Sequence, residues 1–412
     1  MKWGLVKTII FITIFAFIIQ LTFPSLPFAE NEDRKQVVEN EEQESVGKPD
    51  QITITYNDWY QSSVRYAADY LDQTKIPRQV KGLYVTGSTA GIETKFQHLV
   101  QLLNETELNS LVIDVKEDSG YVTYQSNVPL VNEVRSDRKT FIKDIDDLLR
   151  LAKENNIYTI ARIVTFKDPF FAGAKPEYAI QRKTGGVWRD KYGVSWVDHY
   201  RKEVWDYNIA IAKEAAEKGF KEIQFDYVRF PANSKKVDRE ATFNNPENLA
   251  KSEVIAAFLA YAKEQLKDYP VYISADVFGL TTTTVDDMGI GQQWELITAT
   301  VDYISPMMYP SHYANQSYGI PIPDANPYAT IKNGLEDAIE KNNKVREQGQ
   351  NVAIIRPWYQ DFTASWVKGH IKYGPKEVLD QIRAGNELGI DQYLIWNAGN
   401  VYSEGAWMNQ SR

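Results

Sequence analysis

The stretch "EIQFDYVRF", residues 222–230, decides the fold and raises the question of function. Its strand-forming residues make an apolar run of the kind that forms a buried β-strand. Asp226 lies in the middle of this run and Arg229 lies near its end. Because an ionised carboxylate is costly to bury, Asp226 needs a charged partner, a proton or a chemical role.

Similar runs recur along the chain and alternate with amphipathic helical segments. The eight expected strands lie at residues 80–87, 110–118, 158–166, 222–230, 271–279, 301–310, 352–362 and 392–400. Strands that are apolar on both faces and alternate with helices are typical of a parallel sheet that is covered on both sides. The sequence therefore predicts an α/β fold, a (β/α)8 TIM-type barrel with an N-terminal extension.

The main alternative fold is an open, doubly wound sheet. No GxGxxG turn follows any expected strand, and no GxxxxGK phosphate loop is present, so the barrel is favoured. Little chain remains after residue 402 to form the last helix of the barrel. A helix expected at residues 58–71, "DWYQSSVRYAADYL", could cover the barrel in its place.

The N-terminal segment differs in composition from the rest. Two lysines precede an apolar run at residues 8–23, which is the order of a secretory signal peptide or of an uncleaved membrane anchor. Residues 30–50 are rich in glutamate and predict a disordered linker. We therefore expect a signal peptide or anchor at 1–29, an acidic linker at 30–50 and a barrel domain at 51–412. The protein would be extracellular or held at the cell surface, with a possible membrane tether through residues 8–23.

The composition excludes several classes of function. A net charge of −9 argues against a nucleic-acid partner, because nucleic-acid binding needs basic surfaces. The absence of cysteine excludes disulfides, thiolate metal sites and a cysteine nucleophile. The four histidines show neither HxxH nor HExxH spacing, and no GxSxG nucleophile motif is present. We therefore expect no metal site and no cofactor.

The site residues are expected at the carboxyl ends of the strands, where barrel enzymes place their chemistry. Glycoside hydrolysis needs two carboxyl groups, one to protonate the leaving oxygen and one to act as nucleophile or base. Asp226 and Asp276 lie at comparable depth on neighbouring strands and form the expected catalytic pair. Asp226 would be the ionised member, and the apolar surroundings of Asp276 could raise its pKa to that of a general acid. Residues expected to bind substrate or to orient the carboxylates are Asp114, Arg162, Arg229, Tyr309, Trp358 and Trp396.

Structural roles remain open for the same residues. Asp226 or Asp276 could simply pair with a buried arginine, and Asp114 could belong to a salt-bridged strand end. Trp358 and Trp396 are large enough to serve as packing inside a barrel. If the catalytic pair is wrong, Asp114, Glu117 or Asp118 is the next candidate.

The segments "KGLYVTG", "LVIDVKEDSG", "IARIVTFKDP", "IQFDYVRFP", "ISADVFG", "YISPMMYPSHY" and "LIWNAGN" together resemble an uncharacterised bacterial family of glycosyl-hydrolase-like TIM barrels. The resemblance extends over roughly residues 78–402. The family is distantly similar to α-amylase and α-galactosidase barrels and to poly-N-acetylglucosamine hydrolase barrels. In those relatives a carboxylate at the end of strand four is catalytic, and Asp226 matches this position. The acid of amylase-like barrels is a glutamate after strand five, whereas this chain carries Asp276 there.

Two functions follow as hypotheses. The first is an exported glycoside hydrolase that cleaves a cell-envelope or matrix polysaccharide by a two-carboxylate mechanism. The alternative is a non-catalytic carbohydrate-binding or envelope-scaffold protein, in which Asp226 forms a dry salt bridge with Arg229. A polysaccharide deacetylase would need a metal triad that the sequence does not contain. The hydrolase predicts a carboxyl group with a shifted pKa, and the scaffold does not.

Overall fold

The computed structural model describes residues 79–408. The predicted signal peptide or anchor at 1–29, the acidic linker at 30–50 and the helix at 58–71 all lie outside the described residues. Within 79–408, no helix has both the length and the apolar character needed to cross a membrane.

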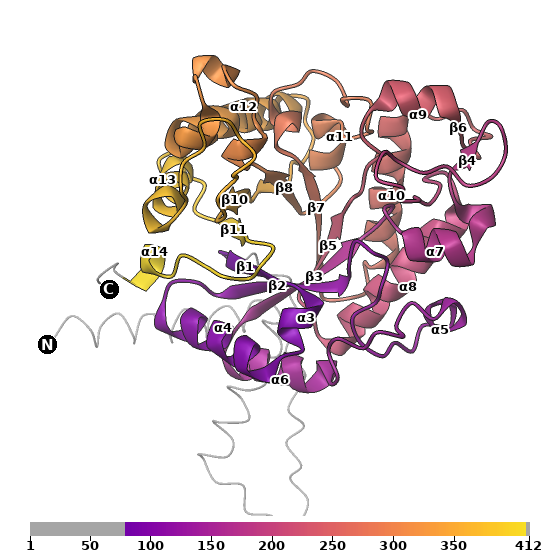
Figure 1. Ribbon diagram of the computed structural model, residues 1–412, viewed down its shortest axis with the longest axis horizontal. Helices are drawn as coiled ribbons and strands as arrows, with labels where there is room; N and C mark the ends of the chain where they lie inside the picture. The colour runs from indigo at the N-terminus through magenta and orange to yellow at the C-terminus, as the bar shows by residue number, and fades with distance from the viewer. Residues whose placement is uncertain (1–78, 409–412) are drawn as a thin grey trace, which may run out of the picture. The chain divides into compact units, whose positions relative to one another are not determined.

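The core of the structure is a closed ring of parallel strands (Figure 1). Strand β1 pairs with β2 on one side and with β11 on the other, and β10 links β11 to β8, which completes the ring. This arrangement confirms the predicted TIM-type barrel. The eight strands are β1 (Lys81–Val85), β2 (Ser110–Lys116), β3 (Tyr158–Val164), β5 (Glu222–Asp226), β7 (Tyr272–Phe278), β8 (Tyr303–Met307), β10 (Trp358–Gln360) and β11 (Tyr393–Trp396).

The seventh expected strand is broken in two. Its first part, β9 (Ile354–Ile355), pairs with β8, and the chain then passes through Arg356 and Pro357 into β10. Since proline has no N–H to donate, the ladder is interrupted at this point. Strand β10 contacts β8 only where Trp358 lies opposite Met307, and its main partner is β11.

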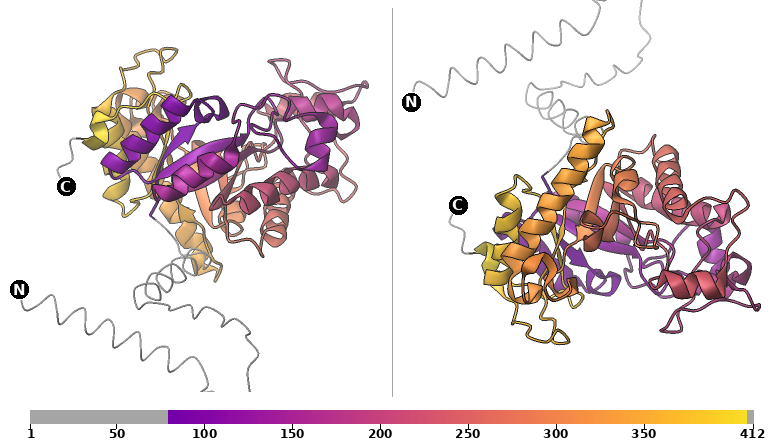
Figure 2. Two further views of the ribbon diagram at one scale, coloured as in Figure 1. Left: turned by 90° about the horizontal axis from the view of Figure 1, so that it is seen from below. Right: turned by 90° about the horizontal axis from the view of Figure 1, so that it is seen from above.

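Helices form the outer layer of the barrel (Figures 1 and 2). Each longer helix turns one apolar side to the strands, as α4 does with Phe96, Leu99 and Leu103. The longer helices are α4 (Glu93–Glu105), α6 (Ile145–Glu154), α8 (Lys202–Lys218), α10 (Lys251–Gln265), α12 (Pro327–Glu347) and α13 (Pro375–Asn386). The shorter ones are α3 (Gly87–Ala90), α5 (Pro129–Val134), α7 (Pro169–Ala174), α9 (Ser234–Glu240), α11 (Trp294–Thr298) and α14 (Gly405–Met408).

The excursions after β3 and β5 meet in a second, smaller sheet. Strand β4 (Gln181–Arg182) pairs antiparallel with β6 (Ala241–Thr242). The sequence indicates only a loop around residues 183–196. Because the partner strand lies about sixty residues away, on the far side of β5, no local pattern reveals this pairing.

The barrel interior contains polar layers above and below an apolar cluster. Near the amino ends of the strands, Glu222 of β5 and Arg356 form a fully buried ion pair, with 3.0 Å between Oε2 and Nη1. A cluster of Val112, Ile160, Leu394 and neighbouring rings occupies the middle. Toward the carboxyl ends the inward side chains become acidic and basic again, and these side chains form the site described next.

Candidate active site

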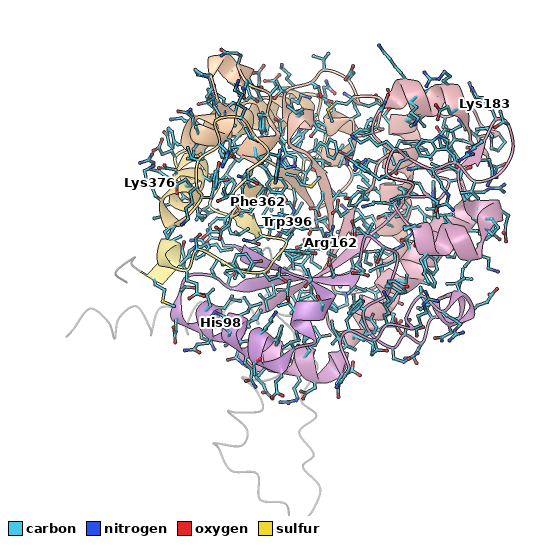
Figure 3. The ribbon with its side chains drawn as sticks, viewed as in Figure 1. His98, Arg162, Lys183, Phe362, Lys376 and Trp396 are labelled. Atoms are coloured by element: carbon cyan, nitrogen blue, oxygen red, sulfur yellow. The ribbon has the colours of Figure 1, made fainter. Side chains whose placement is uncertain are left out.

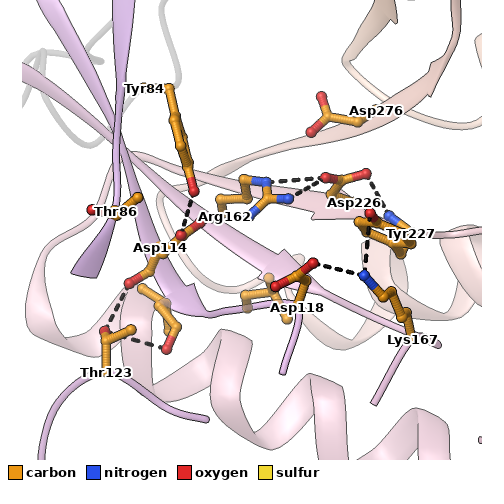
Figure 4. Close-up of polar contacts among 12 residues, drawn as sticks. Tyr84, Thr86, Asp114, Asp118, Thr123, Arg162, Lys167, Asp226, Tyr227 and Asp276 are labelled. Carbon is orange, nitrogen blue, oxygen red and sulfur yellow. Dashed lines mark hydrogen bonds and ion pairs between the residues drawn. The ribbon is translucent and has the colours of Figure 1, made fainter. Parts of the chain in front are cut away.

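Arg162 is the centre of the polar layer at the carboxyl ends of the strands. It lies on β3, between β2 and β5, and its side chain is buried. Its Nη1 donates to Oδ1 of Asp114 at 2.5 Å, and its Nε donates to Oδ2 of Asp226 at 3.0 Å (Figure 4). Its Nη2 also contacts Oδ2 of Asp226. Burial alone would disfavour the cation, but the charges of Asp226 and Asp114 raise the pKa of Arg162 well above its usual value.

Asp114, on the other side of Arg162, belongs to a chain of buried hydrogen bonds. The hydroxyl of Tyr84 on β1 donates to its Oδ2 at 2.6 Å. Burial raises the pKa of Asp114, and Arg162 opposes that rise. Tyr84 is absent from the sequence-based site. Side chains alternate between the two faces of a strand, and the neighbouring Leu83 and Val85 pack outside the barrel against the helices. This alternation would have placed Tyr84 inside the barrel.

Asp226 ends strand β5 with only 5% of its surface exposed. Its Oδ2 accepts from Arg162, and its Oδ1 lies 2.5 Å from the backbone nitrogen of Tyr227. Tyr227 has φ 49°, a left-handed conformation that is uncommon outside glycine. The strand therefore stops abruptly after Asp226, and both carboxylate oxygens are held by donors.

Asp276 lies beside Asp226 on the next strand, β7. Phe225 pairs with Ala275, so the two aspartates are the next residues along neighbouring strands, whose backbones are about 4.8 Å apart. The indole Nε1 of Trp358 donates to Oδ1 of Asp276 at 2.7 Å. Among residues 79–408, no hydrogen bond reaches Oδ2.

The surroundings of Asp276 favour its protonated form. The residue is 1% exposed, and this burial raises its pKa well above the usual value; the negative charge of Asp226 adds to the rise. The indole of Trp358 and the charge of Arg162 oppose the rise without cancelling it. The two neighbouring carboxyl groups therefore have different partners. Asp226 forms an ion pair with Arg162, whereas Asp276 accepts a hydrogen bond from the neutral indole of Trp358.

Aromatic rings lead from these carboxyl groups toward the surface. Trp396 stacks on Tyr84 with ring centres 3.9 Å apart, and Tyr309 lies 6.4 Å from Trp396. Phe362 is 5.8 Å from Tyr309 and stacks on Trp366 at 6.1 Å, and Trp366 is 68% exposed. Figure 3 shows Phe362, Trp396 and Arg162 one after another across the barrel. The sequence-based site contains neither Phe362, the last residue of the expected strand at 352–362, nor Trp366, which lies beyond that strand.

Trp358 and Arg229 lie in the site, but their contacts there differ from those that the sequence predicted. Trp358 is fully buried, so its contact with the site is its hydrogen bond to Asp276. Arg229 packs among aromatic rings and does not form the salt bridge with Asp226 that the scaffold hypothesis assumed. The cation that pairs with Asp226 is Arg162, because strand β3 directs its side chain between the two carboxylates.

Two other polar residues from the strand ends, Lys116 and Asp118, pair with other partners. The pairing register of β2 shifts between Asp114 and Lys116. Lys116 therefore points away from the site and donates to Asp168 and to Asn208 of α8, both at 2.8 Å. Asp118 pairs with Lys167 at 2.7 Å. Within residues 79–408, no cluster of three or more histidine, aspartate or glutamate side chains is arranged to hold a metal ion.

The fold and the site together define a class of protein. A closed parallel barrel carries two neighbouring carboxyl groups at the carboxyl ends of its strands, one paired with a buried arginine and the other buried with a raised pKa. Glycoside hydrolases use this combination. A family model described as "Putative glycosyl hydrolase domain" matches residues 82–402. The chain belongs to this family, and the resemblance inferred from the sequence segments is confirmed.

Several solved structures are similar to the chain. A hypothetical protein from Ruminiclostridium thermocellum is 44% identical, covering 50% of this chain and 98% of that protein, with a TM-score of 0.43. The PgaB (BpsB) glycoside hydrolase domain from Bordetella bronchiseptica is 9% identical, covering 78% and 94%, with a TM-score of 0.55. The chitobiase from Flavobacterium johnsoniae is 10% identical, covering 81% and 49%, with a TM-score of 0.50. The last two likenesses concern the fold alone. A search of the curated proteins found no match.

Proposed function

We propose that this protein hydrolyses a polysaccharide, with Asp276 as general acid and Asp226 as nucleophile or base. The observation that carries the proposal is the unequal environment of these two neighbouring carboxyl groups. Arg162 holds Asp226, whereas burial raises the pKa of Asp276 and leaves its Oδ2 without a hydrogen bond among residues 79–408. The family assignment supports the same class of reaction.

The reaction assigns one task to each group. Asp276 gives its proton to the glycosidic oxygen as the bond from that oxygen to the anomeric carbon breaks. Asp226 either forms a bond to the anomeric carbon or takes a proton from the attacking water. In the first case, water later releases the sugar and returns the proton to Asp276. Arg162 keeps Asp226 in place and shares its charge with Asp114.

The aromatic rings support a glycan chain as substrate. Trp and Tyr faces pack against the apolar faces of sugar rings. The rings from Trp396 through Tyr309 and Phe362 to Trp366 reach from the carboxyl groups to an exposed position. Such a row accommodates several sugar units, which favours a polysaccharide over a single sugar.

We also propose that the protein acts outside the cell or at its surface. The apolar run at residues 8–23 and the acidic segment at 30–50 support export, with the barrel released or tethered to the membrane. The substrate would then be a polysaccharide of the cell envelope or of a surrounding matrix.

The test is the release of reducing sugar from a panel of envelope and matrix polysaccharides. Asp226→Asn should lower the rate by at least about a thousand-fold, because acid–base and nucleophilic groups contribute factors of this order. Asp146→Asn changes an exposed carboxylate on α6 that pairs with Lys218 and serves as the control, with a rate close to wild type. Circular dichroism and thermal unfolding check that both variants fold.

A non-catalytic carbohydrate-binding protein is the second candidate. The near-complete burial of Asp226 and Asp276 favours it, since a buried carboxyl group is less accessible to a substrate. This candidate predicts that no polymer in the panel is cleaved, and that Asp226→Asn leaves glycan binding unchanged.

A further inference from the structure

Arg229 is a buried cation that forms no ion pair with any other residue in the described part of the chain. Only 9% of its surface is exposed. The one side-chain hydrogen bond that Arg229 makes to a described residue runs from Nη1 to the backbone oxygen of Phe230 at 3.0 Å. Among residues 79–408, no carboxylate lies within 4.0 Å of its guanidinium nitrogens. Most of its N–H donors therefore have no protein acceptor among these residues, although arginine has several donors in a planar fork.

Aromatic rings surround the guanidinium of Arg229 and keep it in place. Its central carbon lies 4.6 Å from the ring centre of Phe278, 4.8 Å from that of Tyr227 and 5.2 Å from that of Trp196. Each ring face attracts the cation, and flat faces leave the edge of the guanidinium free to donate. The rings therefore hold the cation without satisfying its hydrogen-bonding capacity.

The backbone at Arg229 is fixed as well. The Nε2 of His199 lies 2.9 Å from the backbone oxygen of Arg229, and the His199 ring stacks on Phe230 with centres 3.7 Å apart. Burial lowers the pKa of His199 to about 3, so the ring is neutral near pH 7 and can donate this hydrogen bond. The backbone nitrogen of Phe230 donates to Ile290 at 2.7 Å. Arg229 thus occupies a prepared position.

That position adjoins the two carboxyl groups. Tyr227, whose ring contacts the guanidinium, follows Asp226 directly, and Phe278 ends the strand that carries Asp276. Asp226 is close enough to act electrostatically on Arg229, although the two do not form a salt bridge. Within residues 79–408, Arg162 is shared by Asp114 and Asp226, and Lys167, over the same Tyr227 ring, pairs with Asp118. Arg229 has no such carboxylate partner there and is available to meet a charge on the substrate.

We propose that Arg229 binds an anionic group, a carboxylate or a phosphate ester, on a sugar next to the cleaved bond, so that the substrate is an acidic glycan. The inference rests on the proposed function, because that function makes a glycan the ligand. The guanidinium fork matches both anions in two-pronged geometry. A bound anion would supply the partner that the buried cation lacks, whereas a neutral sugar would leave it unpaired.

The test is calorimetric binding of matched oligosaccharide pairs that differ only in charge. Hyaluronan oligosaccharides and oligogalacturonates are compared with the same compounds after reduction of their carboxyl groups to alcohols. A mannose 6-phosphate oligosaccharide is compared with its dephosphorylated form. An Asp226→Asn parent prevents turnover during the measurement. We expect the acidic member of at least one pair to bind ten-fold or more tightly than its neutral partner, and that pair identifies the anion.

Variants of Arg229 decide whether this residue carries the preference. Arg229→Gln should abolish the difference within that pair, and Arg229→Lys should keep part of it. Arg138→Gln removes a guanidinium that lies over the rings of Tyr121 and Phe170, away from the site, and should keep the full preference. Circular dichroism confirms folding of each variant. Equal binding within every pair, absence of binding throughout, or a preference that persists in Arg229→Gln would overturn the inference.

Sugar release by the wild-type protein is scored separately on the same pairs. Charge-dependent binding that needs Arg229, without any cleavage, would support the anion site and contradict the hydrolase. Cleavage of neutral and acidic members at equal rates would support the hydrolase and contradict the anion site.

Discussion

The indole Nε1 of Trp358 donates a hydrogen bond of 2.7 Å to Oδ1 of Asp276. The two residues lie on β10 and β7, which are separated in the barrel by β8. The contact therefore spans the interior and fixes the side chain to which we assign the acid role. It also lowers the pKa of Asp276 against the larger effects of burial and of the Asp226 charge.

Trp358→Phe should shift the pH profile of the reaction. The ring remains but the donor is lost, so the pKa of Asp276 should rise further. A hydrogen bond to a charged group is worth about 1.5–3 kcal/mol, and about 1.4 kcal/mol corresponds to one pKa unit. We expect the alkaline limb of kcat/KM to move up by about one pH unit, with roughly ten-fold lower kcat because the carboxyl group is less well oriented.

The control for this substitution is Trp294→Phe. Trp294 donates its indole N–H to Asn342 at 2.9 Å in the helical layer, away from the carboxyl groups. Its loss should leave the pH profile unchanged. An unshifted alkaline limb in Trp358→Phe, with activity retained, would argue against Asp276 as the titrating acid.

Asp276→Asn should stabilise the folded protein at neutral pH while lowering activity on the natural glycan. The folded pKa of Asp276 is raised, so between the unfolded and folded pKa values the native state holds a proton that the unfolded state has released. Stability is therefore lost as pH rises through this window, by about 1.4 kcal/mol for each pH unit. Asparagine stays neutral and can still accept from Trp358, which removes this dependence.

Urea unfolding at pH 4 and pH 7 measures the effect. The stability of Asp276→Asn relative to wild type should increase between these two pH values. If the difference between the two proteins is the same at both, Asp276 does not have a raised pKa in the folded state.

Arg162→Gln should destabilise the protein strongly. Its removal leaves Asp114 and Asp226 buried without their shared cation, and breaking a buried pair in this way costs about 3–5 kcal/mol. Denaturant unfolding at pH 7 would show the loss. Arg150→Gln, which removes two exposed ion pairs on α6, should change little. Similar small effects in both variants would mean that the Arg162 contacts do not stabilise the fold.

Trp366→Ala should weaken binding of long glycans only. Trp366 is 68% exposed, so its removal should not affect folding. Losing one ring–sugar contact of about 1 kcal/mol corresponds to a roughly five-fold higher KM. We expect this rise for polymers and no change for short oligosaccharides, with kcat unaltered in both. An equal effect on short and long substrates would place Trp366 outside a row of sugar sites.

Much of the barrel was predictable because its strands are buried on both faces and therefore appear as apolar runs. The break at Arg356 and Pro357 was less apparent, since apolar residues continue on both sides of it. The pairing of β4 with β6 was not predictable, because its two partners lie far apart in the sequence. The strands can be predicted because an apolar run is a local pattern in the sequence. The break in the seventh strand and the pairing of β4 with β6 depend on tertiary contacts, which a local pattern does not show.

The sequence was sufficient to predict which site residues point into the barrel. Asp114, Arg162, Asp226 and Asp276 all lie late in recognisable strands. The partner of Asp226 was not predictable, since Arg162 and Arg229 both stood as candidates in the sequence. The choice depends on the angle at which β3 directs Arg162 between two carboxylates, and on the rings that hold Arg229 apart.

The dependence of the reaction on the leaving group tests the central claim most directly. Wild type, Asp226→Asn and Asp276→Asn are assayed on the natural glycan and on a dinitrophenyl glycoside of the sugar that the panel identifies. A dinitrophenolate departs without a proton, so it does not need a general acid. We predict that Asp276→Asn loses about a thousand-fold on the glycan but stays within about ten-fold of wild type on the dinitrophenyl glycoside, while Asp226→Asn is inactive on both. If folded Asp276→Asn lost activity equally on both substrates, or if folded Asp226→Asn retained it, the assignment of acid and nucleophile or base to this pair would be contradicted.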